Sequence, residues 1–124
     1  MLSVKEVGLG YQSFEDSEVW KRACRVAVDV YEALIVCRDY GLRDQMTRAA
    51  ISIASNIAEG AECNSGAEYA RFLHIAKGSA AELRTQLYIA QRVGIIDHAT
   101  QTELSEELKQ ISAMLQGLTK SLKT

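Results

Sequence analysis

Apolar residues recur at three- and four-residue intervals along most of this chain, the spacing that aligns side chains on one face of an α-helix. The first such segment covers residues 16–37, and Ser13 or Asp16 is placed to cap its start. Gly41 is the predicted stop signal, because glycine tolerates the left-handed conformation that ends many helices. The inward face of this helix consists of Trp20, Ala23, Ala27, Val30, Tyr31 and Leu34.

The second segment, residues 43–61, is apolar around most of its circumference, so we predict that it is buried and is the central helix. Its apolar side consists of Met46, Ala49, Ala50, Ile53 and Ile57, with Ile51, Ala54 and Ala58 on a flank. The remaining side is a narrow polar stripe formed by Arg48, Ser52, Ser55, Asn56 and Glu59. Gly60 is expected to open the turn that follows.

This polar stripe has two interpretations. One makes it a ligand site inside the bundle, and the other makes it a structural or assembly network bonded to the third helix. The network is favoured because buried polar groups without partners are costly. An antiparallel third helix brings Ser79 toward Ser52, and we predict that Glu82 forms a largely desolvated ion pair with Arg48. Gln86 is a further partner, and the predicted network comprises Arg48, Ser52, Asn56, Glu59, Ser79 and Glu82.

The third and fourth segments complete the helical pattern. Gly78 interrupts the third, residues 66–93, and is expected to mark a close helix crossing, while Gly94 ends that helix. Asp97, or a capping box formed by Thr100 and Glu103, begins the fourth helix. The inward residues of the third are Tyr69, Phe72, Leu73, Ala76, Ala80, Leu83, Leu87 and Ala90. The fourth has a coiled-coil-like seam of Leu104, Leu108, Ile111, Leu115, Leu118 and Leu122.

Helices joined by short turns pack against their neighbours in antiparallel order. We therefore predict an all-α fold, a single antiparallel up-down-up-down four-helix bundle over residues 13–124. Residues 1–12 are expected to be a flexible N-terminal lead-in, since they contain Gly8 and Gly10 and no helical pattern.

Composition agrees with this fold and restricts the location. The chain has 124 residues, 48% of them apolar, and no proline to interrupt a helix. It contains no apolar run near the ~18 residues of a membrane span and no signal-like start. We expect a cytoplasmic protein with no membrane partner.

Candidate catalytic and metal-binding chemistry is sparse. Cys24, Cys37 and Cys63 lack the short spacing of a zinc or redox motif, so free thiols are expected. We expect His74 to be a partly buried structural imidazole and His98 to face water from a turn. Serines are present without a suitably placed histidine, so we predict no enzyme, metal, cofactor or small-molecule substrate. The aromatic residues predicted to pack in the core are Trp20, Tyr31, Tyr69, Phe72 and Tyr88.

The charge balance argues against a dedicated nucleic-acid binder. Fourteen basic and sixteen acidic residues leave a formal charge of −2. Phosphate contacts supply most of the affinity of such proteins, which usually have a basic excess or stripe. A local basic patch would draw on Arg22, Arg25, Arg38, Arg43, Arg71 and Arg84.

Two runs carry a family resemblance. Residues 48–60, RAAISIASNIAEG, and residues 72–83, FLHIAKGSAAEL, resemble the two motifs of the four helix bundle protein family. It is also called the 23S rRNA intervening-sequence protein family, because members are encoded within insertions in bacterial large-subunit rRNA genes. The resemblance extends over about residues 14–122 and includes Trp20 and the Tyr40-Gly41-Leu42 stretch. Departures are Ala54 for a frequent proline, Cys63 for a frequent arginine and Arg43 for a small hydroxyl cap.

The resemblance implies a closed bundle that assembles as a ring-like homopentamer, in a family whose molecular activity is largely unassigned. A related, strongly basic branch serves as an accessory to a reverse transcriptase. Two hypotheses follow. The leading one is a non-catalytic oligomeric scaffold or interaction protein whose main partner is itself. The alternative is a nucleic-acid-associated accessory, which requires a continuous basic band on the assembled surface.

Overall fold

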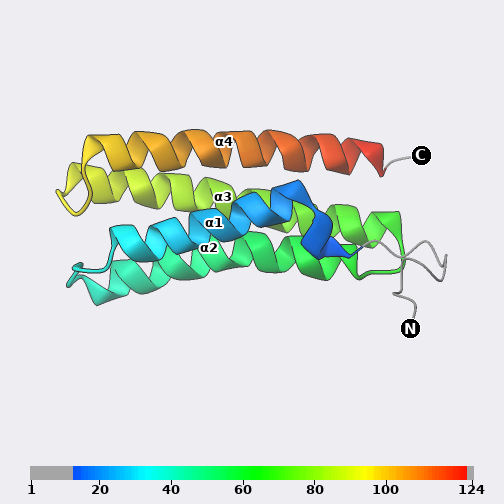
Figure 1. Cartoon of the computed structure of the whole chain (residues 1–124), viewed down its shortest axis with the longest axis horizontal. Helices are drawn as coiled ribbons and strands as arrows, with labels where there is room; N and C mark the ends of the chain where they lie inside the picture. The colour runs from blue at the N-terminus through cyan, green and yellow to red at the C-terminus, as the bar shows by residue number, and fades with distance from the viewer. Residues whose placement is uncertain (1–12, 123–124) are drawn as a thin grey trace.

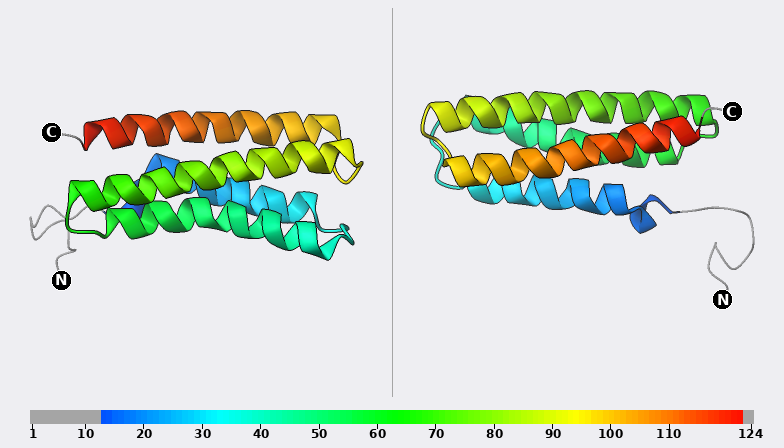
Figure 2. Two further views of the ribbon diagram at one scale, coloured as in Figure 1. Left: turned by 180° about the vertical axis from the view of Figure 1, so that it is seen from behind. Right: turned by 90° about the horizontal axis from the view of Figure 1, so that it is seen from above.

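The computed structural model describes residues 13–122 as a short turn of 3-10 helix followed by four α-helices. Figures 1 and 2 show the four helices side by side, with each running opposite to the one before it. The predicted all-α four-helix bundle is confirmed, and the predicted lead-in, residues 1–12, lies outside the described residues, as do residues 123–124. The elements are η1 (Phe14–Asp16), α1 (Glu18–Ala33), α2 (Tyr40–Ala61), α3 (Gly66–Arg92) and α4 (His98–Ser121).

Side chains at the helix starts explain where α1 and α2 begin. The Ser17 side chain accepts a hydrogen bond from the Trp20 amide at 3.3 Å, so Ser17 caps α1 and the prediction of Ser13 or Asp16 is wrong. Asp39 accepts from the Leu42 amide at 3.1 Å and caps α2. Gly41 therefore lies in the first turn of α2, and its predicted role as a stop signal is also wrong.

The other two helix starts follow the sequence more closely. Ser65 accepts from the Glu68 amide at 3.1 Å at the start of α3. Asp97 accepts from the Thr100 amide at 2.8 Å, which confirms it as the cap of α4. Hydrogen bonding to the Thr100 side chain and amide lowers the pKa of the Asp97 carboxyl group. Gly94 has a φ of 84°, the left-handed conformation expected after α3.

The core lies along the bundle axis, and every α-helix contributes to it. Eight residues of α2 are buried, including its whole predicted apolar face, so the prediction of a buried second helix holds. Its predicted central place is wrong, because α2 packs against α1 and α3 but not against α4. Leu104, Leu108, Ile111 and Leu115 of the predicted α4 seam are buried as well. Among residues 13–122, no helix combines the length and hydropathy that crossing a membrane requires.

Further residues of α1 and α3 are placed differently from the predictions. Tyr31 and Tyr88 are 54% and 52% exposed, because each lies at the outer edge of its helix's apolar face. His74 is exposed, since it points away from the side of α3 that carries buried Leu73. No atom lies within 4 Å of where a Gly78 Cβ would stand, so Gly78 marks no close crossing.

Candidate functional site

The predicted polar network is present between α2 and α3, but it is smaller than expected. The Ser52 and Ser79 hydroxyl oxygens lie 2.9 Å apart, which confirms that these residues meet. Asn56 Nδ2 donates to the Ser52 carbonyl at 2.8 Å and to its hydroxyl at 3.0 Å. Gln86 is 7% exposed, and its Oε1 has no hydrogen-bond partner in the described structure. The network is thus a compact inter-helix contact with one unpaired acceptor beside it.

The charged members of that predicted network lie outside the contact. Arg48, Glu59 and Glu82 are exposed, and within residues 13–122 Arg48 forms no ion pair with Glu82. The predicted desolvated pair is therefore wrong. At about 3.6 residues per turn, Arg48 is rotated roughly 40° further from the core than Ser52, which carries its guanidinium into water. Arg48 and Glu82 both line a shallow hollow, together with Gln45, Ala49 and Ser52.

The six arginines proposed for nucleic-acid contact are dispersed over three helices and a turn. Arg25 lies 3.7 Å from Glu18, and Arg71 lies 3.2 Å from Glu68. The Arg43 guanidinium stands 5.2 Å from the centre of the Tyr40 ring. Arg38 and Arg84 form no ion pair with the described residues. Arg22 and Arg25 share a surface on α1, whereas Arg71 and Arg84 lie on α3, which does not contact α1, so the six do not make one basic patch.

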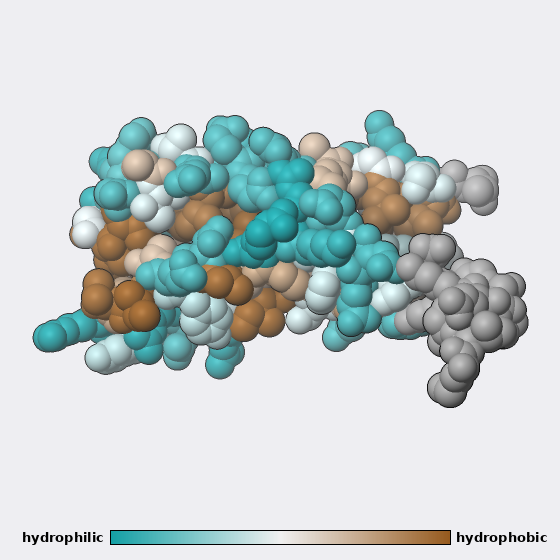
Figure 3. Space-filling model, viewed as in Figure 1, coloured by the Kyte–Doolittle hydropathy of each residue, from teal (hydrophilic) through white to brown (hydrophobic). Residues whose placement is uncertain are grey.

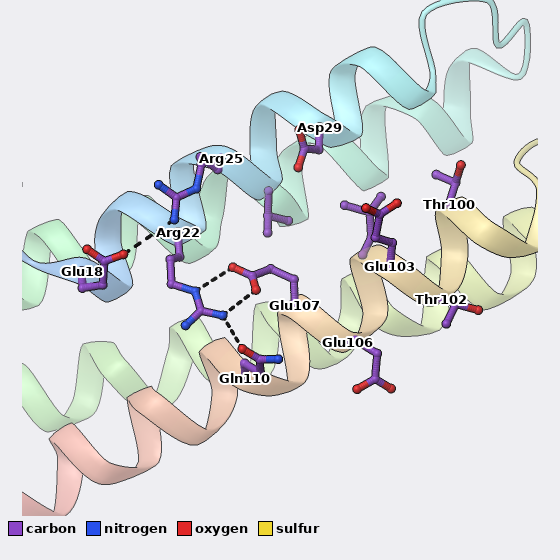
Figure 4. Close-up of a pocket in the computed structure, with 12 residues that line it drawn as sticks. Glu18, Arg22, Arg25, Asp29, Thr100, Thr102, Glu103, Glu106, Glu107 and Gln110 are labelled. Carbon is purple, nitrogen blue, oxygen red and sulfur yellow. Dashed lines mark hydrogen bonds and ion pairs between the residues drawn. The ribbon is translucent and has the colours of Figure 1, made fainter.

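That shared surface is a groove between α1 and α4, with a volume of about 890 Å³. Figure 4 shows Arg22 reaching across it to α4. Arg22 Nε donates to Glu107 Oε2 at 2.7 Å, and its Nη2 donates to Glu107 Oε1 at 2.5 Å and to Gln110 at 2.6 Å. These bonds raise the pKa of Arg22 and lower the pKa of Glu107.

Carboxylates outnumber guanidinium groups along this α1–α4 groove. Its two arginines face five acidic residues, Glu18, Asp29, Glu103, Glu106 and Glu107. Such a surface repels phosphate groups rather than attracting them. The arrangement therefore disfavours this groove as a nucleic-acid contact.

Exposed apolar side chains are concentrated at the end of the bundle that holds the α1–α2 and α3–α4 turns. Figure 1 places both turns at this end, and Figure 3 shows brown, apolar surface over the α1–α2 turn. Seven of the ten exposed large apolar residues in the described part of the chain lie here. We call this surface the apolar end; it comprises Tyr31, Ile35, Val36, Tyr40, Tyr88, Ile89 and Val93.

Sequence reasoning missed the apolar end because it assigned Tyr31 and Tyr88 to the core. Ile35 and Val36 fall inside the predicted helix over residues 16–37, but in the structure they follow the last turn of α1 and are 75% and 85% exposed. Two adjacent β-branched residues beyond a helix end are poor turn formers. The turn therefore does not require Ile35 and Val36, and their exposed side chains indicate a surface contact.

The remaining groups with chemical potential are the possible metal ligands and the cysteine thiols. Within residues 13–122, no three histidine, cysteine, aspartate or glutamate side chains gather where a metal ion could be held. Cys24, Cys37 and Cys63 are free thiols, each half-buried. Burial raises the pKa of the Cys24 thiol, which lowers its reactivity at neutral pH.

Comparisons with known proteins agree with the resemblance and the fold. A crystal structure of a protein with unknown function from the S23 ribosomal protein family of Bacteroides thetaiotaomicron superposes with a TM-score of 0.77. At 24% identity, the match covers 82% of this chain and 98% of that one, which shows a shared fold. No functionally curated protein matches. The family model described as 23S rRNA-intervening sequence protein matches residues 15–117, so the chain belongs to that family.

Proposed function

We propose that this protein is a non-catalytic, homo-oligomeric scaffold or interaction protein whose copies join through the apolar end. The observation that carries the proposal is the concentration of seven exposed large apolar side chains there. Burying one such side chain fully contributes about 1.5–3 kcal/mol, whereas exposed ion pairs contribute far less. Exposed apolar side chains gathered at one end of a molecule are typical of protein contact sites. A homopentamer is the assembly that the family resemblance implies.

The polar groups that the fold brings together support a structural role. Ser52 of α2 bonds to Ser79 of α3 and also accepts from Asn56 of its own helix, and Arg22 of α1 bonds to Glu107 of α4. These arrangements join helices, and in none of them does a base lie beside a nucleophile. The surface that remains for contact with another molecule is therefore the apolar end.

The nucleic-acid accessory hypothesis has weaker support. Arg22, Arg25 and Arg71 each have a carboxylate partner. Five acidic residues and only two arginines line the α1–α4 groove. Binding of a polyanion would need a basic surface formed by several copies together.

Light scattering of the full chain at micromolar concentration tests the proposal. The expected mass is near five times the 13.7 kDa of one chain. The mass should persist in high salt, because apolar contact rather than ion pairing holds the copies together. A purely monomeric species at every concentration examined would contradict the proposal.

A further inference from the structure

The apolar end contains two surfaces of different shape. The first is the α1–α2 groove, a hollow of about 340 Å³ lined by Tyr31, Glu32, Leu34, Ile35, Arg43, Asp44 and Thr47. The second is the α3 ridge, which we define as Tyr88, Ile89, Arg92 and Val93. Tyr88, Ile89 and Val93 are 52%, 47% and 65% exposed. One surface is concave and the other is the outward side of a single helix.

The α3 ridge is apolar with one positive charge. Arg92 Nη1 donates to the Tyr88 hydroxyl at 2.9 Å, and its guanidinium lies 5.8 Å from the centre of that ring. These contacts hold the charge on the ridge, and Arg92 forms no ion pair with the described residues. The guanidinium is therefore available to a carboxylate of another molecule.

The α1–α2 groove has the complementary charge. Glu32 and Asp44 line it and form no ion pair with the described residues. The one cation, Arg43, is held over the Tyr40 ring. Two carboxylates and one guanidinium leave the groove acidic, while Leu34 and Ile35 give it an apolar wall. It suits an apolar ridge that carries a positive charge.

The positions of the two surfaces allow copies to repeat the same contact. Helix α1 packs against α2 and α4, and α3 packs against the same two helices, so α1 and α3 lie at opposite corners. The outward side of α3 is consequently rotated about 90–135° around the bundle from the α1–α2 face, which for a head-to-tail contact corresponds to a closed ring of roughly four to eight copies. Because both surfaces lie at one end, copies with parallel axes bring them to the same level (Figure 1).

We propose that the α3 ridge of one copy docks into the α1–α2 groove of a second copy, with Arg92 facing Glu32 and Asp44 across the contact. This inference rests on the proposed oligomeric function and specifies its interface. The contact is heterologous: each copy uses its groove toward one neighbour and its ridge toward the other. The apolar residues supply the affinity, and the charges fix the orientation.

Complementation between two variants tests the pairing. Ile35→Glu disables the groove, and Val93→Glu disables the ridge; both positions are more than half exposed, so the fold is retained. Each variant alone is expected to be a monomer by sedimentation. Mixed in equal amounts at high concentration, they should form a species of twice the 13.7 kDa chain mass, through the one intact groove and the one intact ridge.

Ile75→Glu is the control variant, because it makes the same change on α3 away from the apolar end. It should keep the wild-type mass, and circular dichroism should show that all variants are folded. A monomeric wild type contradicts the proposed function itself. An oligomeric wild type whose Val93→Glu variant keeps the full mass contradicts the ridge, and a mixture that stays monomeric contradicts the pairing.

Charge reversal tests the orientation. Arg92→Glu should reduce the assembled fraction at least tenfold, because it places a third carboxylate opposite Glu32 and Asp44. Adding Asp44→Arg to the same chain should restore assembly at low salt. If the double variant recovers none of the lost mass, the facing of Arg92 with Asp44 is wrong.

Discussion

Gly60 lies on the side of α2 that faces α3, where no room remains for a side chain. A Cβ at this position would stand 2.8 Å from Phe72 Cβ and 2.9 Å from Tyr69 Cδ1. Gly60→Ala should therefore lower the free energy of unfolding by about 1–3 kcal/mol, because the helices must move apart. Urea denaturation followed by circular dichroism measures this change.

Gly78→Ala is the matched control for that substitution. Gly78 is also inside a helix, but its Cβ would meet nothing within 4 Å. Alanine there should raise the free energy of unfolding by about 1 kcal/mol through helix propensity alone. Equal effects of the two changes would show that space at Gly60 does not limit the packing.

The two glycines also show what the sequence could not supply. Gly78 was expected to mark a close crossing and Gly60 to open a turn, yet their roles are nearly exchanged. Spacing along a helix identifies the inward face, as it did for Ile53 and Ile57. It does not reveal which residue of another helix approaches that face, and this approach decides where glycine is required.

The bond between Arg22 and Glu107 predicts a pH dependence. Hydrogen bonding to Arg22 lowers the pKa of Glu107 below its ordinary 4.5 in the folded state. The resulting stabilisation is present above pH 4.5 and is lost as the pH falls through the lower folded value. Glu107→Gln should cost about 1 kcal/mol at neutral pH and remove part of the wild-type loss of stability below about pH 4.5. Parallel slopes of Tm against pH for both proteins would contradict this.

At the scale of elements, the polar contact between α2 and α3 is a pair of hydroxyl groups rather than a pair of charges. Ser79→Ala should lower the free energy of unfolding by about 1 kcal/mol, because the Ser52 hydroxyl loses its partner. Adding Ser52→Ala should cost less than the two separate losses summed. Arg48→Ala and Glu82→Ala should each change stability by less than about 0.5 kcal/mol, since both residues are exposed. Chemical denaturation of the wild type and five variants, including Ser52→Ala alone, tests the ranking, and a large loss from Glu82→Ala would restore the ion-pair hypothesis.

The predicted helix faces and caps are correct where they depend on residues of one helix alone. The apolar faces of α2 and α4 and the caps at Gly94 and Asp97 follow from local spacing and local hydrogen bonds. The sequence predicts a start of the second helix at residue 43, because Gly41 resembles the stop signal of the first. Asp39 instead supplies the cap, and the chain turns between Ala33 and Tyr40. Asp39, the cap, and Gly41, the expected stop signal, are only two residues apart, so the sequence alone does not decide where the second helix begins.

At the scale of the whole molecule, each surface combines residues that are distant in the sequence. Glu18 and Asp29 of α1 join Glu103 and Glu106 of α4 along one groove. Neither helix shows that acidic surface by itself, because α1 also carries Arg22 and Arg25. The motifs indicated the family, and the fold was predictable from periodicity. The surfaces depend on which helices become neighbours, so they required the structure.

The acidic groove between α1 and α4 predicts weak binding of nucleic acid. Fluorescence titration of generic single-stranded and duplex RNA should show weak binding at physiological salt, with a shallow salt slope, because few phosphates are neutralised. Glu103→Lys combined with Glu106→Lys adds two cations beside Arg22 and should both tighten binding and steepen the slope, whereas the exposed-site control Ala113→Gln should do neither. Sub-micromolar affinity of the wild type that falls steeply with salt would require a basic surface made by assembled copies, and would favour the accessory role over the scaffold.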